Sequence, residues 1–344
     1  MRKKYIAVFG LIVLFIIPGI VSRAQTTTGG ADPQDAKELG REYTKLFYEG
    51  AFGTVWSKFD AAMQKVLGSE DNLKAFRGQV NQQLGDESSV ESEEVASVSS
   101  ARIYTRLARF KRVPDLIEVA WTMDEKGTVL GFYIRPAQKE AETQYLEYKT
   151  KTDLRVPFDG AWYVFWGGRT ISQNYHAKVV DQRFALDIIM MKDGSSHAGD
   201  GLTNDQYHCF SKPIFAPGSG VIAAAVDGIE DNVPGVMNAR QPVGNHVVID
   251  HGNGEFSFLA HFKKGSLNVK EGQRIAPGEL LGLCGNSGNS SEPHLHFHLQ
   301  TTAVYSKGEG LPAQFQNYVA DGKPVDRGEP VKGQTIERRS DSRP

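Results

Sequence analysis

From Arg183 to about Thr302 the chain consists of short runs of β-forming residues separated by turn-forming residues. Runs such as VIAAAV, HVVID, FSFLAHF and HLHFHLQ are bounded by Gly, Pro or Asn-Gly within a few positions. This spacing is typical of antiparallel strands joined by tight turns, and neither heptads nor a repeat of fixed period is present. The sequence therefore predicts a mainly-β C-terminal domain with antiparallel sheets.

The first half of the chain has a different periodicity. Apolar residues recur at three and four positions over 36–47, 55–67 and 73–84, which predicts amphipathic helices. Alternation over 117–136 then predicts a β-hairpin. Helices followed by an antiparallel meander indicate a small α+β domain over 35–136. This order of elements resembles nuclear-transport-factor-like domains, and because the segment contains no histidine, a binding or spacer role is expected.

The N-terminus has the pattern of an export signal. A basic MRKK precedes an apolar run of about a dozen residues, and the small residues Ser22 and Ala24 suit cleavage after Ala24. We expect residues 1–24 to be a signal peptide and 25–34 a flexible leader. The mature chain is therefore expected in the periplasm or outside the cell, and not in the membrane.

Charge and cysteine content limit the possible partners. The 39 basic and 41 acidic residues give no electrostatic reason to expect nucleic acid, and the oligomeric state stays open. Cys209 and Cys284 either pair in an oxidising compartment or remain two buried thiols, because spacing alone does not bring them within bridging distance. Residues 137–175 are expected to be a linker and packing segment, and 336–344 a polar tail.

Three histidines stand on alternate positions, His294, His296 and His298, in the stretch GNSGNSSEPHLHFHLQ. Alternation is the period of a β-strand, so the three side chains are expected on one face. A zinc site needs three or four donors drawn from His, Asp, Glu and Cys. Two earlier stretches, FALDI with Asp187 and LAHF with His261, supply further candidates.

Together these stretches resemble the lysostaphin-type zinc metallopeptidases, the LytM-domain endopeptidases, over residues 183–302. PIFAPGSGVI, GNHVVIDHGNGEFSFLAHF, VKEGQRIAPGELLGLCGNSGNSS and PHLHF occur in the order of the family. The resemblance implies a duplicated hybrid motif fold, Zn²⁺ as cofactor, and peptidoglycan or a peptide as substrate. It also implies that Asp187 and His296 bind the metal, while His261 and His294 take part in catalysis without binding it.

Position 183 departs from the family pattern. The family's first ligand is a histidine four residues before the aspartate, and here that residue is Arg183, whose guanidinium has no acceptor lone pair. His176, upstream on a predicted loop, is the expected replacement. The alternatives are loss of a competent zinc site, or another ligand such as His208, His197 or Cys209. Arg183 is then expected to contact a substrate carboxylate or an acidic neighbour.

The remaining predictions concern the substrate groove and the domain limits. Candidates for lining the groove are His246, Asn245, Arg183 and His298, although structural roles also fit His246 and His298. The peptidase domain is expected over 176–335. An insert at 191–213 is either a groove wall or a surface loop.

Two functions are compatible with these residues. The first is an exported zinc metalloendopeptidase that hydrolyses peptide bonds in peptidoglycan stems or cross-bridges, with zinc-activated water as nucleophile. The second is a catalytically degenerate domain of the same fold that binds the cell wall or activates a partner hydrolase, as the arginine at 183 suggests. Retention of Asp187, His261, His294 and His296 favours the enzyme, since a non-catalytic domain has no chemical need for them.

Overall fold

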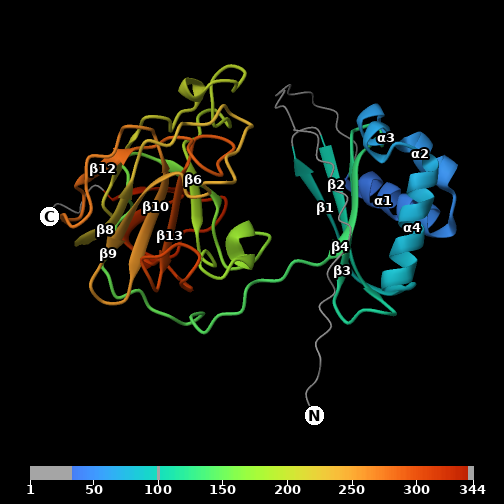
Figure 1. Ribbon diagram of the computed structural model, residues 1–344, viewed down its shortest axis with the longest axis horizontal. Helices are drawn as coiled ribbons and strands as arrows, with labels where there is room; N and C mark the ends of the chain where they lie inside the picture. Colours follow the sequence, from blue (N-terminus) through green and yellow to red (C-terminus); the bar gives the residue numbers. More distant parts are fainter. Residues whose placement is uncertain (1–32, 99–100, 340–344) are drawn as a thin grey trace, which may run out of the picture. The chain divides into compact units, whose positions relative to one another are not determined.

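The computed structural model describes residues 33–98 and 101–339, so the predicted signal peptide and most of the predicted leader lie outside the described residues. The chain divides into two compact units, Met1–Gln138 and Lys139–Pro344, which are described separately (Figure 1). Within the described ranges, no helix has both the length and the apolar composition needed to cross a membrane.

From residue 33, where the description begins, the first unit contains the helices α1 (Pro33–Glu49), α2 (Phe52–Lys58), α3 (Ala61–Leu67) and α4 (Glu70–Leu84). The stretch expected as one helix over 55–67 is divided, because Asp60 caps a new helix by accepting a hydrogen bond from the Met63 N–H. Ser69 caps α4 in the same way by accepting from the Asn72 N–H. Polar caps thus set helix starts that the apolar spacing alone does not reveal.

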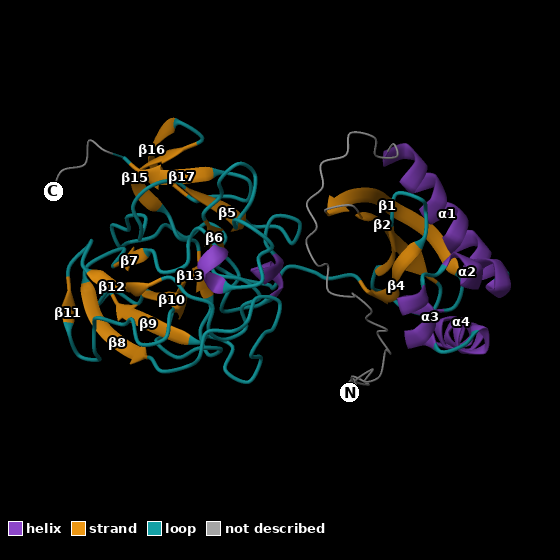
Figure 2. Ribbon diagram, turned by 90° about the horizontal axis from the view of Figure 1, so that it is seen from above, coloured by secondary structure: helices purple, strands orange, loops and turns teal. Residues whose placement is uncertain are grey.

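The helices are followed by an antiparallel meander in the order β1 (Glu87–Val98), β2 (Ala101–Phe110), β3 (Ile117–Met123) and β4 (Val129–Pro136). The helices pack on one face of this sheet (Figure 2). In the core between them, Trp121 stacks on Phe132 with ring centroids 3.8 Å apart, and Phe47 of α1 meets Phe132 at 5.0 Å. The predicted order of helices followed by antiparallel strands is confirmed, whereas the likeness to nuclear-transport-factor-like domains stays a prediction.

The second unit is mainly β with antiparallel sheets, as predicted. One large sheet runs in the order β11-β8-β9-β10-β13-β6-β5-β17-β15-β16, with β14 paired to β13, and β12 pairs with β7 in a small sheet. The strands are β5 (Trp162–Trp166), β6 (Leu186–Ile189), β7 (Pro213–Phe215), β8 (Gly220–Val226), β9 (Asn245–Asp250), β10 (Phe256–Phe262), β11 (Arg274–Ile275), β12 (Leu280–Leu283), β13 (Leu295–Gln300), β14 (Gly310–Leu311), β15 (Phe315–Ala320), β16 (Lys323–Gly328) and β17 (Thr335–Arg338). Two short 3₁₀ turns are η1 (Tyr175–Lys178) and η2 (Asn204–Gln206).

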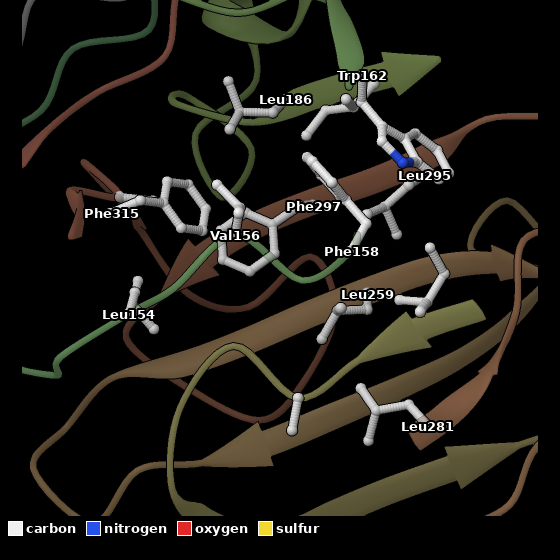
Figure 3. Packing of buried hydrophobic residues seen from close by; sticks show 14 of the residues in the cluster. Leu154, Val156, Phe158, Trp162, Leu186, Leu259, Leu281, Leu295, Phe297 and Phe315 are labelled. Carbon is white, nitrogen blue, oxygen red and sulfur yellow. The ribbon is translucent and has the colours of Figure 1, made fainter. Parts of the chain in front are cut away.

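This unit extends beyond the predicted peptidase limits at both ends. Within the segment expected as a linker and packing segment, β5 pairs with β6, and Val156 and Phe158 are buried in the core beside Leu186 (Figure 3). At the other end β17 includes the first residues of the expected polar tail, and Ile336 is fully buried. Apolar side chains at both ends complete one hydrophobic core, so neither segment behaves as a free connection.

Strand β13 lies in the middle of the sheet and positions the site. Leu295 and Phe297 point into the core, so His296 faces the opposite side of the sheet (Figure 3). The register places His296 opposite Asp187 on β6 and opposite Ala260 on β10. Pairing between strands far apart in the sequence therefore brings the aspartate and a histidine together.

Candidate metal and active site

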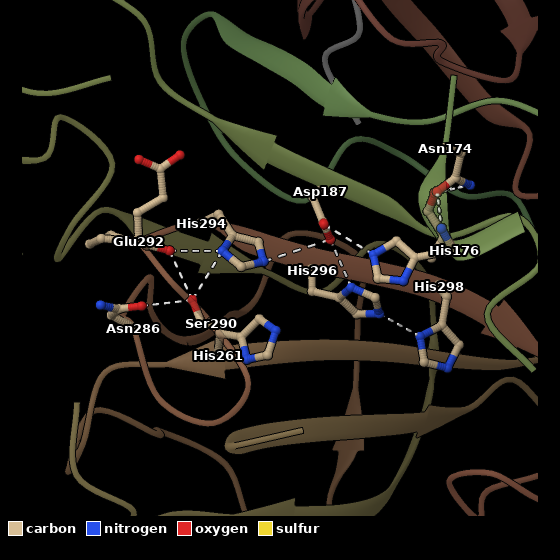
Figure 4. A network of polar contacts seen from close by, with 12 residues as sticks. Asn174, His176, Asp187, His261, Asn286, Ser290, Glu292, His294, His296 and His298 are labelled. Atoms are coloured by element: carbon tan, nitrogen blue, oxygen red, sulfur yellow. Dashed lines mark hydrogen bonds and ion pairs between the residues drawn. The ribbon is translucent and has the colours of Figure 1, made fainter. Parts of the chain in front are cut away.

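Asp187 is the centre of a compact group of three buried side chains. Its carboxylate oxygens lie 2.8 Å from Nδ1 of His296 and 3.0 Å from Nε2 of His176 (Figure 4). One ligand atom from each residue lies within 4.8 Å of the others. Burial raises the pKa of Asp187, but the neighbouring His176 and His294 and the hydrogen bonds from His176 and His296 outweigh burial and hold that pKa well below its usual range. The carboxylate is therefore ionised.

The turn η1 brings His176 to this group. Asn174, directly before the turn, accepts a hydrogen bond from the His176 backbone N–H at 3.1 Å. The side-chain amide of Asn174 donates to the carbonyl oxygens of Gly168 at 3.1 Å and Ala185 at 3.0 Å, and Asn174 is fully buried. Asn174 thus ties the turn to the start of β6. This role was not predicted, although an asparagine just before a loop histidine is a usable turn signal.

The donor set fits a zinc ion. Two imidazole nitrogens and a carboxylate are ordinary zinc ligands, and three protein ligands leave a position open, as in catalytic sites. Burial lowers the pKa of His296, which favours the neutral imidazole that coordination needs. The group contains His176 and none of the alternative third ligands His197, His208 and Cys209.

A β-bulge directs His261 toward the site. The register between β9 and β10 shifts between Ala260 and Phe262, and His261 has a φ of +67°. Non-glycine residues seldom adopt this conformation, so the bulge aims the side chain at a cost in backbone energy. Nδ1 of His261 lies 2.7 Å from the Ser287 carbonyl oxygen, which can only accept, so Nδ1 carries the proton. Burial lowers the pKa of His261 well below its usual range, which leaves Nε2 unprotonated.

His294, like His261, is held through its Nδ1, which lies beside a backbone carbonyl oxygen. Its Nδ1 lies 2.8 Å from the Glu292 carbonyl oxygen and 3.1 Å from Oγ of Ser290, while its Nε2 lies 3.7 Å from Oδ1 of Asp187. The rings of His261 and His294 have centroids 4.7 Å apart. Two imidazoles anchored through Nδ1 therefore stand beside the three-residue group (Figure 4).

A cleft of about 370 Å³ opens on Asp187 and His294. Its other lining residues are aromatic side chains from β5 and η1, two apolar side chains, and polar residues just before β13: Phe165, Trp166, Tyr175, Ile189, Met237, Asn289, Ser291 and Glu292. Burial and the neighbouring Asp187 raise the pKa of Tyr175, so its hydroxyl stays a donor. Tyr175 and Glu292 were not predicted as site residues. The sequence signal for them is their position just before His176 and His294.

Arg183 does not line the cleft. The residue is 5% exposed, and its Nε and Nη1 donate to the carbonyl oxygens of Ala141 at 3.0 Å and Arg169 at 2.6 Å. The N–H of Ala141 in turn donates to the Ala177 carbonyl oxygen at 2.7 Å, within the turn that carries His176. Arg183 therefore stabilises the backbone segments that contact that turn. Its placement does not support the expected substrate contact.

The other groove candidates differ in access. Asn245 is fully buried, and its side chain bonds to the backbone of Ile229 and Phe262, so its placement does not support a groove role. His298 is also buried and contacts His296 instead of the cleft. His246 is partly exposed and lies opposite Ala260 on the His296 face, so its groove role stays a prediction.

The insert at 191–213 borders the site. Oγ of Ser196 donates to the Glu292 carboxylate at 3.3 Å, and Sγ of Cys209 donates to the Pro293 carbonyl oxygen at 2.9 Å. Cys209 and Cys284 are both buried free thiols. Because these contacts reach the two residues before His294, the insert supports the loop that positions that histidine.

One carboxylate and two histidines, with a further position left open, form a donor set that catalytic metal sites use. Residues 206–308 match the model of peptidase family M23, so this part of the chain resembles a peptidase M23 domain. His176 and Asp187 lie before the matched residues.

Individual relatives resemble only part of the chain. The peptidoglycan DD-endopeptidase ShyA of Vibrio cholerae is 36% identical over 88 residues, which are 25% of this chain and 17% of ShyA. The cell division protein DipM of Caulobacter vibrioides is 32% identical over 102 residues, 30% of this chain and 15% of DipM. The catalytic domain of lysostaphin from Staphylococcus simulans shares 20% identity at a TM-score of 0.26, over 43% of this chain and 86% of that domain. The chain thus covers less than a fifth of the length of these two sequence relatives.

Proposed function

We propose that this chain is an exported zinc metalloendopeptidase that hydrolyses peptide bonds in peptidoglycan stems or cross-bridges. The observation that carries the proposal is the grouping of His176, Asp187 and His296 beside the imidazoles of His261 and His294. A metal group with an open position next to proton-accepting side chains can carry out metal-assisted amide hydrolysis. The M23 match and the signal-like N-terminus support the proposal.

Each residue has a definite task in this proposal. His176, Asp187 and His296 would hold the zinc ion, which when bound polarises the scissile carbonyl and lowers the pKa of the attacking water. His261 and His294 keep a proton on Nδ1 through backbone carbonyls, so their Nε2 atoms are oriented to accept the proton that the water loses. The imidazolium so formed can return that proton to the leaving amine.

The substrate class is inferred from the relatives and from the cleft. ShyA is by name a peptidoglycan DD-endopeptidase, and the matched segment of this chain is similar to it. A cleft of about 370 Å³ suits a peptide of small residues better than bulky side chains. The Glu292 carboxylate adds a negative charge at the cleft, which suits a substrate carrying an amino group.

A second function, binding to the cell wall without hydrolysis, is motivated by Arg183 at the family's ligand position. Digestion of purified peptidoglycan with the mature chain, followed by mass spectrometry of the released fragments, separates the two. The endopeptidase predicts new peptide termini that a chelator abolishes, zinc restores, and His294→Ala lacks. Cosedimentation with peptidoglycan at saturating zinc without any new termini would instead establish the binding function.

A further inference from the structure

A hydrogen-bonded chain of side chains continues from the candidate metal group into the interior of the unit. Nε2 of His296 lies 2.9 Å from Nδ1 of His298, which is 1% exposed (Figure 4). The His298 ring stacks on Phe258 of β10, with centroids 4.6 Å apart and planes at 11°. This stacking fixes the orientation of the ring, so His298 presents Nδ1 to His296.

Gln300 follows two residues later on the same face of β13 and is fully buried. Its Nε2 donates to the carbonyl oxygens of Thr302 at 2.7 Å and Val304 at 3.1 Å, which fixes the orientation of the amide. Oε1 of Gln300 and Nε2 of His298 are buried, and neither has a hydrogen-bond partner among the described residues, although the two side chains interact. The Gln300 side chain therefore borders the His298 ring on the same face of β13.

Both ring nitrogens of His296 are held by neighbouring side chains. Nδ1 lies 2.8 Å from Oδ1 of Asp187, and Nε2 lies 2.9 Å from Nδ1 of His298. Because the ring cannot turn without breaking one of these contacts, His298 keeps Nδ1 of His296 beside Asp187, within the candidate metal group.

We propose that His298 and Gln300 are positioning residues that hold the His296 ring with its Nδ1 directed at the metal position. The inference rests on the proposed function, because it assigns these residues a role toward a proposed zinc ligand. It replaces the groove role expected for His298 with one that acts through His296. Hydrogen-bond partners of metal-binding histidines commonly change metal affinity about 10- to 100-fold.

Two variants at position 298 separate this role from packing. Asparagine places Oδ1 near the position of the imidazole Nδ1 and can accept from His296, whereas leucine is a similar-sized side chain without an acceptor. We expect the zinc Kd, measured by competition with a chromophoric chelator, to rise about 10- to 100-fold in His298→Leu and to stay within about threefold in His298→Asn.

A second readout does not require metal. Long-range ¹H–¹⁵N NMR spectra of the metal-free full chain should show a hydrogen bond between Nε2 of His296 and Nδ1 of His298, which His298→Leu should remove. Gln300→Leu should weaken zinc binding in the same direction as His298→Leu. Spectra without a hydrogen bond between His296 and His298, or equal zinc affinities of His298→Leu and His298→Asn, would overturn the inference. If the wild type binds no zinc, the spectra still decide whether His298 holds His296, and it is the proposed function that fails.

Discussion

Replacing Asn174 with alanine should disable the candidate metal group without touching any of its three members. The change removes three hydrogen bonds of a buried side chain, to the His176 N–H and to the carbonyl oxygens of Gly168 and Ala185. Each is worth about 1 kcal/mol net, so the turn loses about 3 kcal/mol. If that loss allows the turn to open, the apparent zinc Kd rises about 100-fold, since every 1.4 kcal/mol is tenfold.

The assay is a zinc titration with a competing chelator, combined with urea unfolding of the metal-free chain. Ser172→Ala is the matched control, because Ser172 is exposed two residues away in the same segment and its hydroxyl bonds to the neighbouring Thr170 hydroxyl. We expect the control to bind zinc as the wild type does. A folded Asn174→Ala protein that binds zinc within about twofold of the wild type would refute the view that Asn174 positions His176.

Three further predictions follow from individual contacts. In the first unit, the Arg41 hydrogen bond lowers the pKa of Glu93 to about 2. The free energy of unfolding should therefore fall by up to about 3 kcal/mol as the pH drops from 5 to 2, and Glu93→Gln should make unfolding curves less dependent on pH in this range. Arg183→His should not restore zinc binding to His176→Ala, because the side chain at 183 points to the carbonyl oxygens of Ala141 and Arg169; recovered zinc would contradict this orientation. Deleting residues 25–136 should leave hydrolysis of a small soluble peptide intact, and loss of activity in a folded deletion would show that the first unit contributes to the site.

The parts of the site that lie on one strand could be predicted from the sequence, because the period of a strand assigns side chains to faces. Residues 294, 296 and 298 therefore separate from the core-facing Leu295 and Phe297 without any structure. The neighbours of that strand could not be predicted in this way. That Asp187 lies opposite His296 depends on pairing across more than a hundred residues, and the direction of His261 depends on a bulge that its sequence does not signal.

The position of the loop that carries His176 could not be predicted from the sequence either. The chemistry of a guanidinium excludes Arg183 as a ligand and calls for a replacement, but only the 3₁₀ turn after Asn174 shows that His176 reaches Asp187. The start of the second unit could not be predicted from the sequence for a related reason. The segment before β5 is charged and turn-rich, so its buried Val156 and Phe158 do not stand out as core residues in the sequence.

The zinc content of the purified wild type and of His176→Ala, after metal supplementation and removal of free metal, tests the central claim most directly. Elemental mass spectrometry should find about one zinc per chain in the wild type and almost none in the variant, because two remaining donors make a poor site. A wild type without zinc would contradict the metalloendopeptidase proposal. A folded His176→Ala protein that keeps its full zinc content would contradict the assignment of His176 as the ligand that replaces position 183.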